Sequence, residues 1–182
     1  AVNGADAKDA LRLACRPAAV LVDPTFARTV LDGVWRGGLG ELVRQAAVQD
    51  APLMKKLAKN AEALRGRDEA LLGGAIRDSL ATRAKKGPTD FALWGAFRLE
   101  AMSGYKLPHG YAVPLAVCLD CGYAVEKGLM EEADQELVCK TLADCGALDG
   151  LSHSQHLLSQ TEGILRGLED WRLATGTEHV VM

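Results

Sequence analysis

The chain has few aromatic side chains, no long apolar run and no excess of positive charge. Aromatic residues make up 5% of its 182 residues, which disfavours the stacking surfaces that bind single-stranded nucleic acid. A net charge of -3 provides no basic field for nucleic acid or for an anionic membrane surface. The longest apolar stretches, such as residues 111–119, are far too short to span a bilayer. We therefore expect no nucleic-acid partner and no membrane segment.

A signal-peptide pattern is also missing, because residues 1–8 carry no basic start followed by an apolar run. The five cysteines are an odd number, and without an export signal they do not suggest a disulfide framework. We expect reduced thiols and a cytoplasmic protein. Hydrophobic residues at 48% and charged residues at 25% are typical of a globular protein, and a chain of this length can form one domain with its own core.

Helical periodicity dominates what the sequence does contain. Apolar side chains recur three and four residues apart, which predicts helices at about 39–47, 52–64, 68–80, 94–102, 108–128, 131–145 and 155–173. Residues 18–23 form the one strand candidate, a short apolar run between two prolines. The predicted fold class is all-α: a helical bundle with one short N-terminal strand-like segment.

Local signals also predict where some helices begin and end. Asp23 precedes Pro24, a pair that suits the N-cap and first turn of a short helix. The sequence Lys-Lys-Gly-Pro at 85–88 is a helix stop signal. We expect Thr89 or Asp90 to cap the helix that follows.

Five segments, in the same order, resemble motifs of dehydroquinate synthases and related sugar phosphate cyclases. Residues 17–26 resemble the segment that joins the nucleotide-binding domain of that family to its helical domain. Residues 38–44 (Gly-Leu-Gly-Glu-Leu-Val-Arg) are similar to a family helix that reads Gly-Leu-Ala-Glu-Val-Ile-Lys. Residues 90–100 resemble Asp-Phe-Gly-His-Trp-Ser-Ala-His-Lys-Leu-Glu of one cyclase branch. Residues 109–113 resemble His-Gly-Glu-Ala-Val, and residues 167–172 resemble Gly-Leu-Glu-Glu-Phe-Arg.

The resemblance implies a division of the chain and a site within it. Residues 1–23 would lead into a helical, metal- and substrate-binding domain formed by residues 24–182. In that family, an active site with NAD oxidises a sugar phosphate, eliminates phosphate, reduces the product and closes a carbocycle. A divalent metal, usually zinc, is held there by one Glu and two His. The resemblance places these ligands at Glu41, Leu93 and His109.

Several of the implied site positions depart from the family pattern. Leu93 has no atom that can bind a metal, and Phe97, four residues later on the same helical face, replaces a second family His. Tyr111 stands where the family carries Glu. Arg44 stands where a phosphate-handling Lys is expected, and Arg83 is implied to act likewise. An Arg can bind phosphate, but it does not exchange a proton. Three positions are therefore degenerate, and the two arginines remain candidates for substrate binding.

These departures define what we expect of cofactors and partners. Glu41 and His109 remain as a residual metal pair, for which zinc is the candidate. The glycine pairs at 37–38 and 73–74 lie inside helical patterns, so neither forms a loop that cradles phosphate, and NAD would bind only through a partner chain. The first hypothesis is a non-catalytic cyclase homologue that acts as a partner or regulatory subunit. A helical half alone exposes an apolar face, so we expect it to associate with an intact cyclase-like chain or with itself.

The second hypothesis is enzymatic. The chain could be the metal- and substrate-binding half of a split NAD-dependent sugar phosphate cyclase, a lyase that needs a second, NAD-binding chain. Glu41, His109, Arg44 and Arg83 would then serve the substrate.

The third hypothesis is a thiol-rich metal-binding module. Cys118 and Cys121 form a C-x-x-C pair, and Cys139 and Cys145 follow. The first pair lies within a predicted helix and the second pair is widely spaced, which favours buried thiols over a zinc ribbon. His153 and His156 have a spacing that suits a metal, although a cap or a surface position is the commoner role of such a pair.

Overall fold

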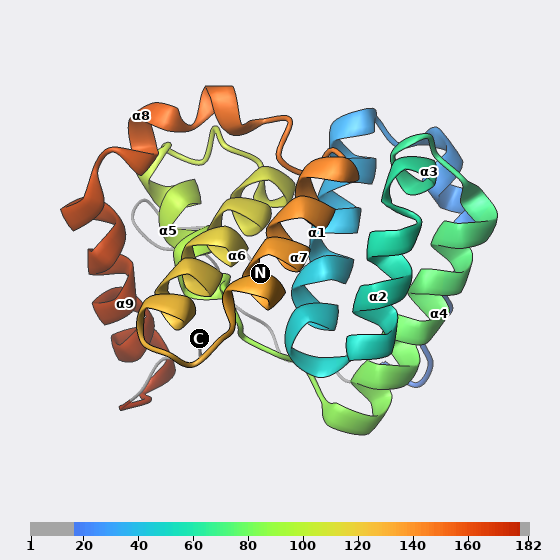
Figure 1. Cartoon of the computed structure of the whole chain (residues 1–182), viewed down its shortest axis with the longest axis horizontal. Coiled ribbons are helices and arrows are strands. Elements are labelled where there is room, and N and C mark those ends of the chain that lie inside the picture. The colour runs from blue at the N-terminus through green and yellow to red at the C-terminus, as the bar shows by residue number, and fades with distance from the viewer. Residues whose placement is uncertain (1–16, 179–182) are drawn as a thin grey trace.

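The computed structural model describes residues 17–178, and this part of the chain is all-α (Figure 1). The elements are η1 (Pro24–Thr29), α1 (Asp32–Gln49), α2 (Ala51–Lys59), α3 (Ala61–Arg65), α4 (Glu69–Lys86), α5 (Leu93–Met102), α6 (His109–Glu126), α7 (Glu132–Asp144), η2 (Leu151–His153), α8 (Gln155–Leu158) and α9 (Thr161–Thr175). The predicted all-α class is confirmed. Within the described range, no helix is both long and apolar enough to cross a membrane.

Helices α1 and α6 lie at the centre of the bundle, with α4 and α9 at opposite ends of its long axis (Figure 1). Glycines allow α1 and α6 to approach closely. A Cβ atom on Gly37 would lie 2.7 Å from the Cα atom of Gly110, and one on Gly40 would lie 2.7 Å from the Cγ atom of Pro114. Both distances are shorter than side-chain packing tolerates. Because Glu41 follows Gly40 and His109 precedes Gly110, this contact brings the two site residues together.

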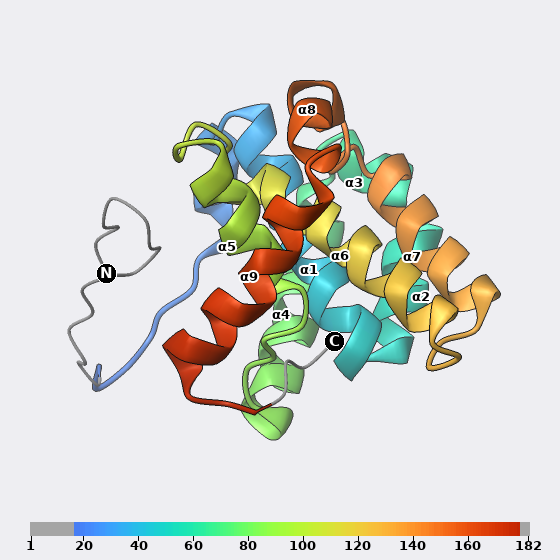
Figure 2. The same cartoon turned by 90° about the vertical axis from the view of Figure 1, so that its left-hand side faces the viewer.

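The predicted strand at residues 18–23 does not form. The segment leaves the bundle as an extended ribbon (Figure 2), and its Val20 and Leu21 side chains are 74% and 95% exposed. A strand needs a neighbour to pair with its backbone N–H and C=O groups, and no segment of residues 17–178 supplies one. The helix start that follows is confirmed, because Asp23 Oδ1 accepts a hydrogen bond from the backbone N of Thr25 at 2.9 Å and η1 begins at Pro24.

Two predicted helices are interrupted. The helix predicted at 52–64 divides at Asn60 into α2 and α3, and the last helix divides near Ser159 and Gln160 into α8 and α9. The stop signal after α4 is confirmed, because the helix ends at Lys86 and Gly87 follows with a positive φ of +82°, which glycine adopts without steric cost.

The predicted cap of α5 is wrong. Helix α5 begins after Ala92, whose φ is +61°, and neither Thr89 nor Asp90 caps it with a side chain. Asp120 of α6 accepts the hydrogen bonds of this turn instead. Its Oδ2 accepts from the backbone N of Ala92 at 3.1 Å, and its Oδ1 accepts from Trp94 Nε1 at 3.0 Å. Because Asp120 is 1% exposed, burial raises the pKa of its carboxyl to about 6, and the two donors only partly oppose that rise.

Candidate functional site

A cavity of about 710 Å³ lies among α1, α4, the loop before α5, and the first turns of α5 and α6. Six of the seven residues singled out by the resemblance line this cavity: Glu41, Arg44, Arg83, Leu93, Phe97 and His109. The seventh, Tyr111, lines a different cavity. The sequence motifs therefore converge on one place, although they come from four helices.

The imidazole of His109 lies between two carboxylates. Its Nε2 atom is 3.1 Å from Glu41 Oε1, and its Nδ1 atom is 2.6 Å from Glu100 Oε1. A neutral imidazole has one donor and one acceptor nitrogen, so two ionised carboxylates are both satisfied only by the doubly protonated ring. The imidazole therefore bridges Glu41 and Glu100 through both of its ring nitrogens.

Glu100 was not among the predicted site residues. It is the last residue of the 90–100 motif, and its 4% exposure shows that α5 buries it beside His109. A buried Glu needs a partner of this kind. In the sequence, the only signal was its place as the last residue of the 90–100 segment that resembles a cyclase motif.

Glu41 completes an ionic chain that continues to Arg44. Glu41 Oε2 accepts from Arg44 Nε at 2.9 Å. Burial alone would raise the pKa of Glu41, but the hydrogen bonds and charges of His109 and Arg44 outweigh it and hold the pKa below its ordinary value. Glu41 is therefore an anion at neutral pH, and its oxygens are already engaged by neighbouring side chains.

The two arginines of the cavity differ in how they are used. Arg44 is buried, and its Nη1 donates to the backbone oxygens of Thr89 and Phe91, at 2.9 Å each. It thereby fixes the loop before α5. Arg83 is exposed and forms no ion pair with another residue of the described chain. Of the two predicted substrate-binding residues, Arg83 is the one whose guanidinium remains open to an anion.

Leu93 and Phe97 give the cavity an apolar side. The ring of Phe97 is 5.9 Å from that of His109 and 5.6 Å from that of Trp171, measured between centroids. Leu93 lines the same cavity and brings no donor atom. Glu41 and His109 are hydrogen-bonded to each other and form two ligands at most, whereas the family site uses three. The residues present do not match the three-ligand zinc site that the resemblance implies.

Tyr111 acts in packing. A Cβ atom on Gly33 would lie 2.3 Å from Tyr111 Oη, and one on Gly150 would lie 2.6 Å from Tyr111 Cδ1. The ring thus fills the space between α1 and the segment after α7 only because both positions lack a side chain. It does not reach the cavity that contains His109.

The cysteines offer little support for a metal module. Four of them, at 118, 121, 139 and 145, are free thiols that are buried or half-buried, and Cys15 lies outside the described residues. Burial, with the neighbouring charges of Cys139 and Asp120, raises the pKa of Cys121 to about 12, so it is protonated at neutral pH. Across residues 17–178, no group of three or more His, Cys, Asp or Glu side chains is arranged to hold a metal ion. The side chain of His153 is not described, and His156 lines the cavity that contains Tyr111.

The described residues form an all-α fold, and six residues of its first cavity lie at positions that resemble cyclase motifs. Comparison with known proteins also finds similarity to 3-dehydroquinate synthases. The chain is 25% identical to 3-dehydroquinate synthase of Dehalococcoides mccartyi (strain 195) over 157 residues, which cover 80% of this chain and 44% of that protein. It is 28% identical to 3-dehydroquinate synthase of Citrifermentans bemidjiense over 149 residues, covering 75% and 41%. With the enzyme of Rhodopseudomonas palustris (strain TIE-1), it is 25% identical over 213 aligned positions, covering 100% and 54%.

These similarities are distant, and the chain spans about half the length of the curated relatives it matches. No protein-family model and no solved structure matches it. The chain is therefore a distant relative of 3-dehydroquinate synthases in sequence.

Proposed function

We propose that this chain is a non-catalytic relative of dehydroquinate synthase that acts by association, as a partner or regulatory subunit of a cyclase-like chain. One observation carries the proposal. Leu93 and Phe97 line the cavity where the resemblance expects two imidazoles, and the ligands that remain, Glu41 and His109, are hydrogen-bonded to each other. A site of this kind lacks a metal ligand and a proton carrier.

The remaining charges support a structural role. In the chain Glu100–His109–Glu41–Arg44, each side chain is hydrogen-bonded to the next. These partly buried groups from α1, α5 and α6 are therefore satisfied without a ligand, and removal of one of them would leave its neighbour without a partner. The proposal keeps residues 24–182 as one helical domain, with residues 1–23 leading into it.

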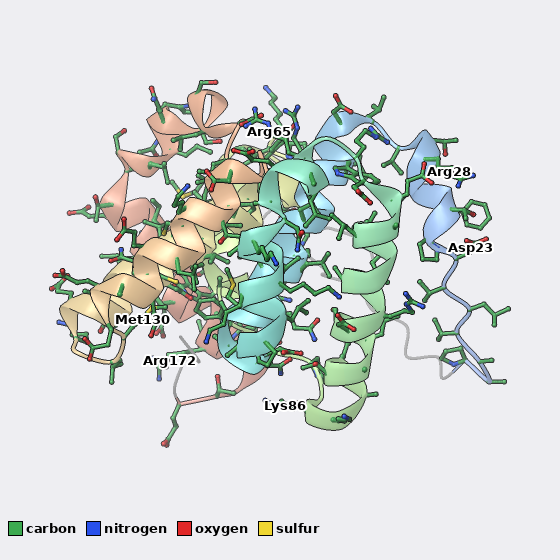
Figure 3. All side chains as sticks on the ribbon, turned by 45° about the vertical axis from the view of Figure 1, so that its right-hand side comes forward. Asp23, Arg28, Arg65, Lys86, Met130 and Arg172 are labelled. Carbon is green, nitrogen blue, oxygen red and sulfur yellow. The ribbon has the colours of Figure 1, made fainter. Side chains whose placement is uncertain are left out.

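An exposed apolar surface supports association. The surface, which we call the N-terminal apolar surface, consists of Val20, Leu21, Phe26, Leu31 and Val34, whose exposures run from 61% to 95%. It follows the chain from the extended segment through η1 to the first turn of α1, and Figure 3 shows Asp23 and Arg28 of this stretch beside α4. Large apolar side chains exposed in succession along one stretch of chain favour an interaction surface.

The central part of this surface is held in place by α4 and the residues before it. Arg67 donates to the backbone oxygens of Ala27 and Val30, at 3.1 and 2.9 Å, and Arg28 Nε donates to Glu69 of α4 at 2.6 Å. A preformed surface loses less conformational entropy on binding. The curated relatives are about twice as long as this chain. The partner we propose is accordingly a cyclase-like chain whose nucleotide-binding domain covers the surface and supplies any NAD site.

The proposal is tested by the composition of the natively purified protein. We expect a second, cyclase-like chain in a fixed ratio, identified by mass spectrometry. The double variant Leu21→Asp with Phe26→Asp should abolish that association, because it places charges on the apolar contact. Leu165→Asp on α9 is the matched control, since Leu165 is also exposed, at 54%, but lies far from the surface in sequence and on another helix. If the natural protein and the Leu165→Asp control were both monomeric and carried no partner chain, the proposal would be contradicted.

A split cyclase is the second candidate function. It is favoured by the open guanidinium of Arg83 and by a cavity large enough for a sugar phosphate. It predicts about one zinc ion per chain, lost in Glu41→Ala, together with turnover of a sugar phosphate when the partner chain and NAD are supplied. The first candidate predicts neither.

A further inference from the structure

A second cavity, of about 540 Å³, lies beside α8 and takes side chains from several separate parts of the fold. Arg36 comes from α1, Lys106 and Leu107 from the connection between α5 and α6, Tyr111 from α6, and His156 from α8. The volume falls within the roughly 300–1,000 Å³ typical of small-molecule sites.

Positive charge predominates at this cavity. Arg36 Nη1 and Arg65 Nη2 both contact the same oxygen, Oδ2 of Asp149, at 2.7 and 3.0 Å. One carboxylate is therefore shared by two guanidinium groups, and Asp149 is the one acidic residue that lines the cavity among the residues described. Lys106 is exposed and forms no ion pair with the rest of the described chain. The cavity is thus cationic in a chain whose net charge is -3.

The floor of the cavity is apolar and fixed. Leu107 and Leu157 are 7% and 2% exposed, so their side chains are part of the core. The ring of Tyr111 is held between Gly33 and Gly150, where a Cβ atom on either glycine would overlap it. A rigid aromatic ring beside exposed cations suits a ligand that has both an apolar body and a negative charge.

The geometry points to a binding site for a small organic anion, a carboxylate or a phosphate ester with an apolar or aromatic body. The body lies against Tyr111, and the anionic group meets Lys106 and Arg36 at the rim, where charge-assisted hydrogen bonds give both affinity and orientation. This inference is independent of the proposed function, because neither Glu41 nor His109 lines the second cavity.

An NMR titration with phenyl phosphate tests the inference. We expect the amide signals of residues 106, 107, 109–111 and 149–157 to shift in a saturable way at millimolar probe concentration. Benzylamine, which presents the same ring with a positive charge, should shift none of them. Added salt should weaken the phenyl phosphate response, because screening reduces attraction between exposed charges.

Three variants assign the binding to this cavity. Lys106→Met removes one cation from an exposed position and should weaken phenyl phosphate binding roughly fivefold. Lys59→Met, a matched change at an exposed Lys of α2, should leave the affinity unchanged. Arg83→Met removes the open cation of the first cavity and should also leave it unchanged. Loss of binding in Arg83→Met but not in Lys106→Met would overturn the inference, as would the absence of any saturable shift at residues 106, 107, 109–111 and 149–157.

Discussion

Two cavities of this domain use their charged side chains in different ways. In the first, His109 is held between Glu41 and Glu100, and Glu41 is also bonded to Arg44. In the second, the cations outnumber the single carboxylate that lines it. A set of charges that satisfies itself stabilises a fold, whereas an unbalanced set remains available to a ligand. The first cavity, whose residues resemble an enzyme site, is thus the better candidate for a structural role, and the second cavity is the better candidate for binding.

The largest expected effect lies at Asp120, which holds the start of α5 and so places Leu93 and Phe97 in the first cavity. Asp120→Ala leaves the buried Trp94 Nε1 and Ala92 N without their acceptor. We expect the free energy of unfolding to fall by roughly 3 kcal/mol, the cost of two unsatisfied buried donors. Urea unfolding followed by circular dichroism measures it. A loss no larger than that of an exposed control such as Asp134→Ala would contradict this role.

Asp120 also predicts a pH dependence. Its pKa is raised to about 6 in the folded protein, above the 3.8 of an ordinary Asp carboxyl, so the native state favours the protonated form. The stability that this preference contributes is fully present below pH 3.8 and is lost as the pH rises through about 6. Asp120→Asn, which cannot ionise, should flatten this part of the stability profile. An unchanged profile in the variant would show that another group titrates there.

The next effect compares the two cavities directly. His109→Leu removes the imidazole that bridges Glu41 and Glu100 and should lower the free energy of unfolding by about 2 kcal/mol, because the buried Glu100 carboxyl loses its hydrogen-bond partner. Lys106→Met in the second cavity should change it by less than about 0.5 kcal/mol, as expected for an exposed side chain without a partner. Equal effects of the two substitutions in thermal or urea unfolding would remove the distinction between the cavities.

A smaller effect is expected where α1 meets α6. Gly37→Ala places a Cβ atom 2.7 Å from the Gly110 backbone and should cost about 1–2 kcal/mol through overpacking. Gly38→Ala is the matched control, since nothing lies within 4 Å of its Cβ position, and its better helix propensity should stabilise α1 by up to about 1 kcal/mol. If Gly37→Ala had the same free energy of unfolding as Gly38→Ala, the stability of the domain would not depend on the close approach of α1 and α6 that brings Glu41 to His109.

The sequence predicts the helices well because the helix period is a local property. Apolar spacing located the central helices, and Asp23 with Pro24 located the start of η1. The predicted strand failed because an apolar run signals a need for burial and cannot supply a pairing partner. The cap predicted at Thr89 or Asp90 failed because the acceptor that serves this turn, Asp120, lies 28 residues further along the chain than Ala92.

The candidate site was only partly predictable. The resemblance identified six residues that the fold brings to one cavity, but it gave no indication that Glu41 and His109 bond to each other. Glu100 was missed because its burial arises from the packing of α5 against α6, which local sequence does not encode. The resemblance places Tyr111 where the family site carries Glu, whereas its ring packs between Gly33 and Gly150, two glycines that are far apart in sequence.

The most direct test of the account is zinc content, measured by elemental analysis, in the natural protein and in Leu93→His. Because both nitrogens of His109 and both oxygens of Glu41 are already engaged, we expect neither the natural protein nor the variant with the added imidazole to hold zinc in a fixed ratio. About one zinc ion in the natural protein, lost in Glu41→Ala, would contradict the account and would support a split enzyme.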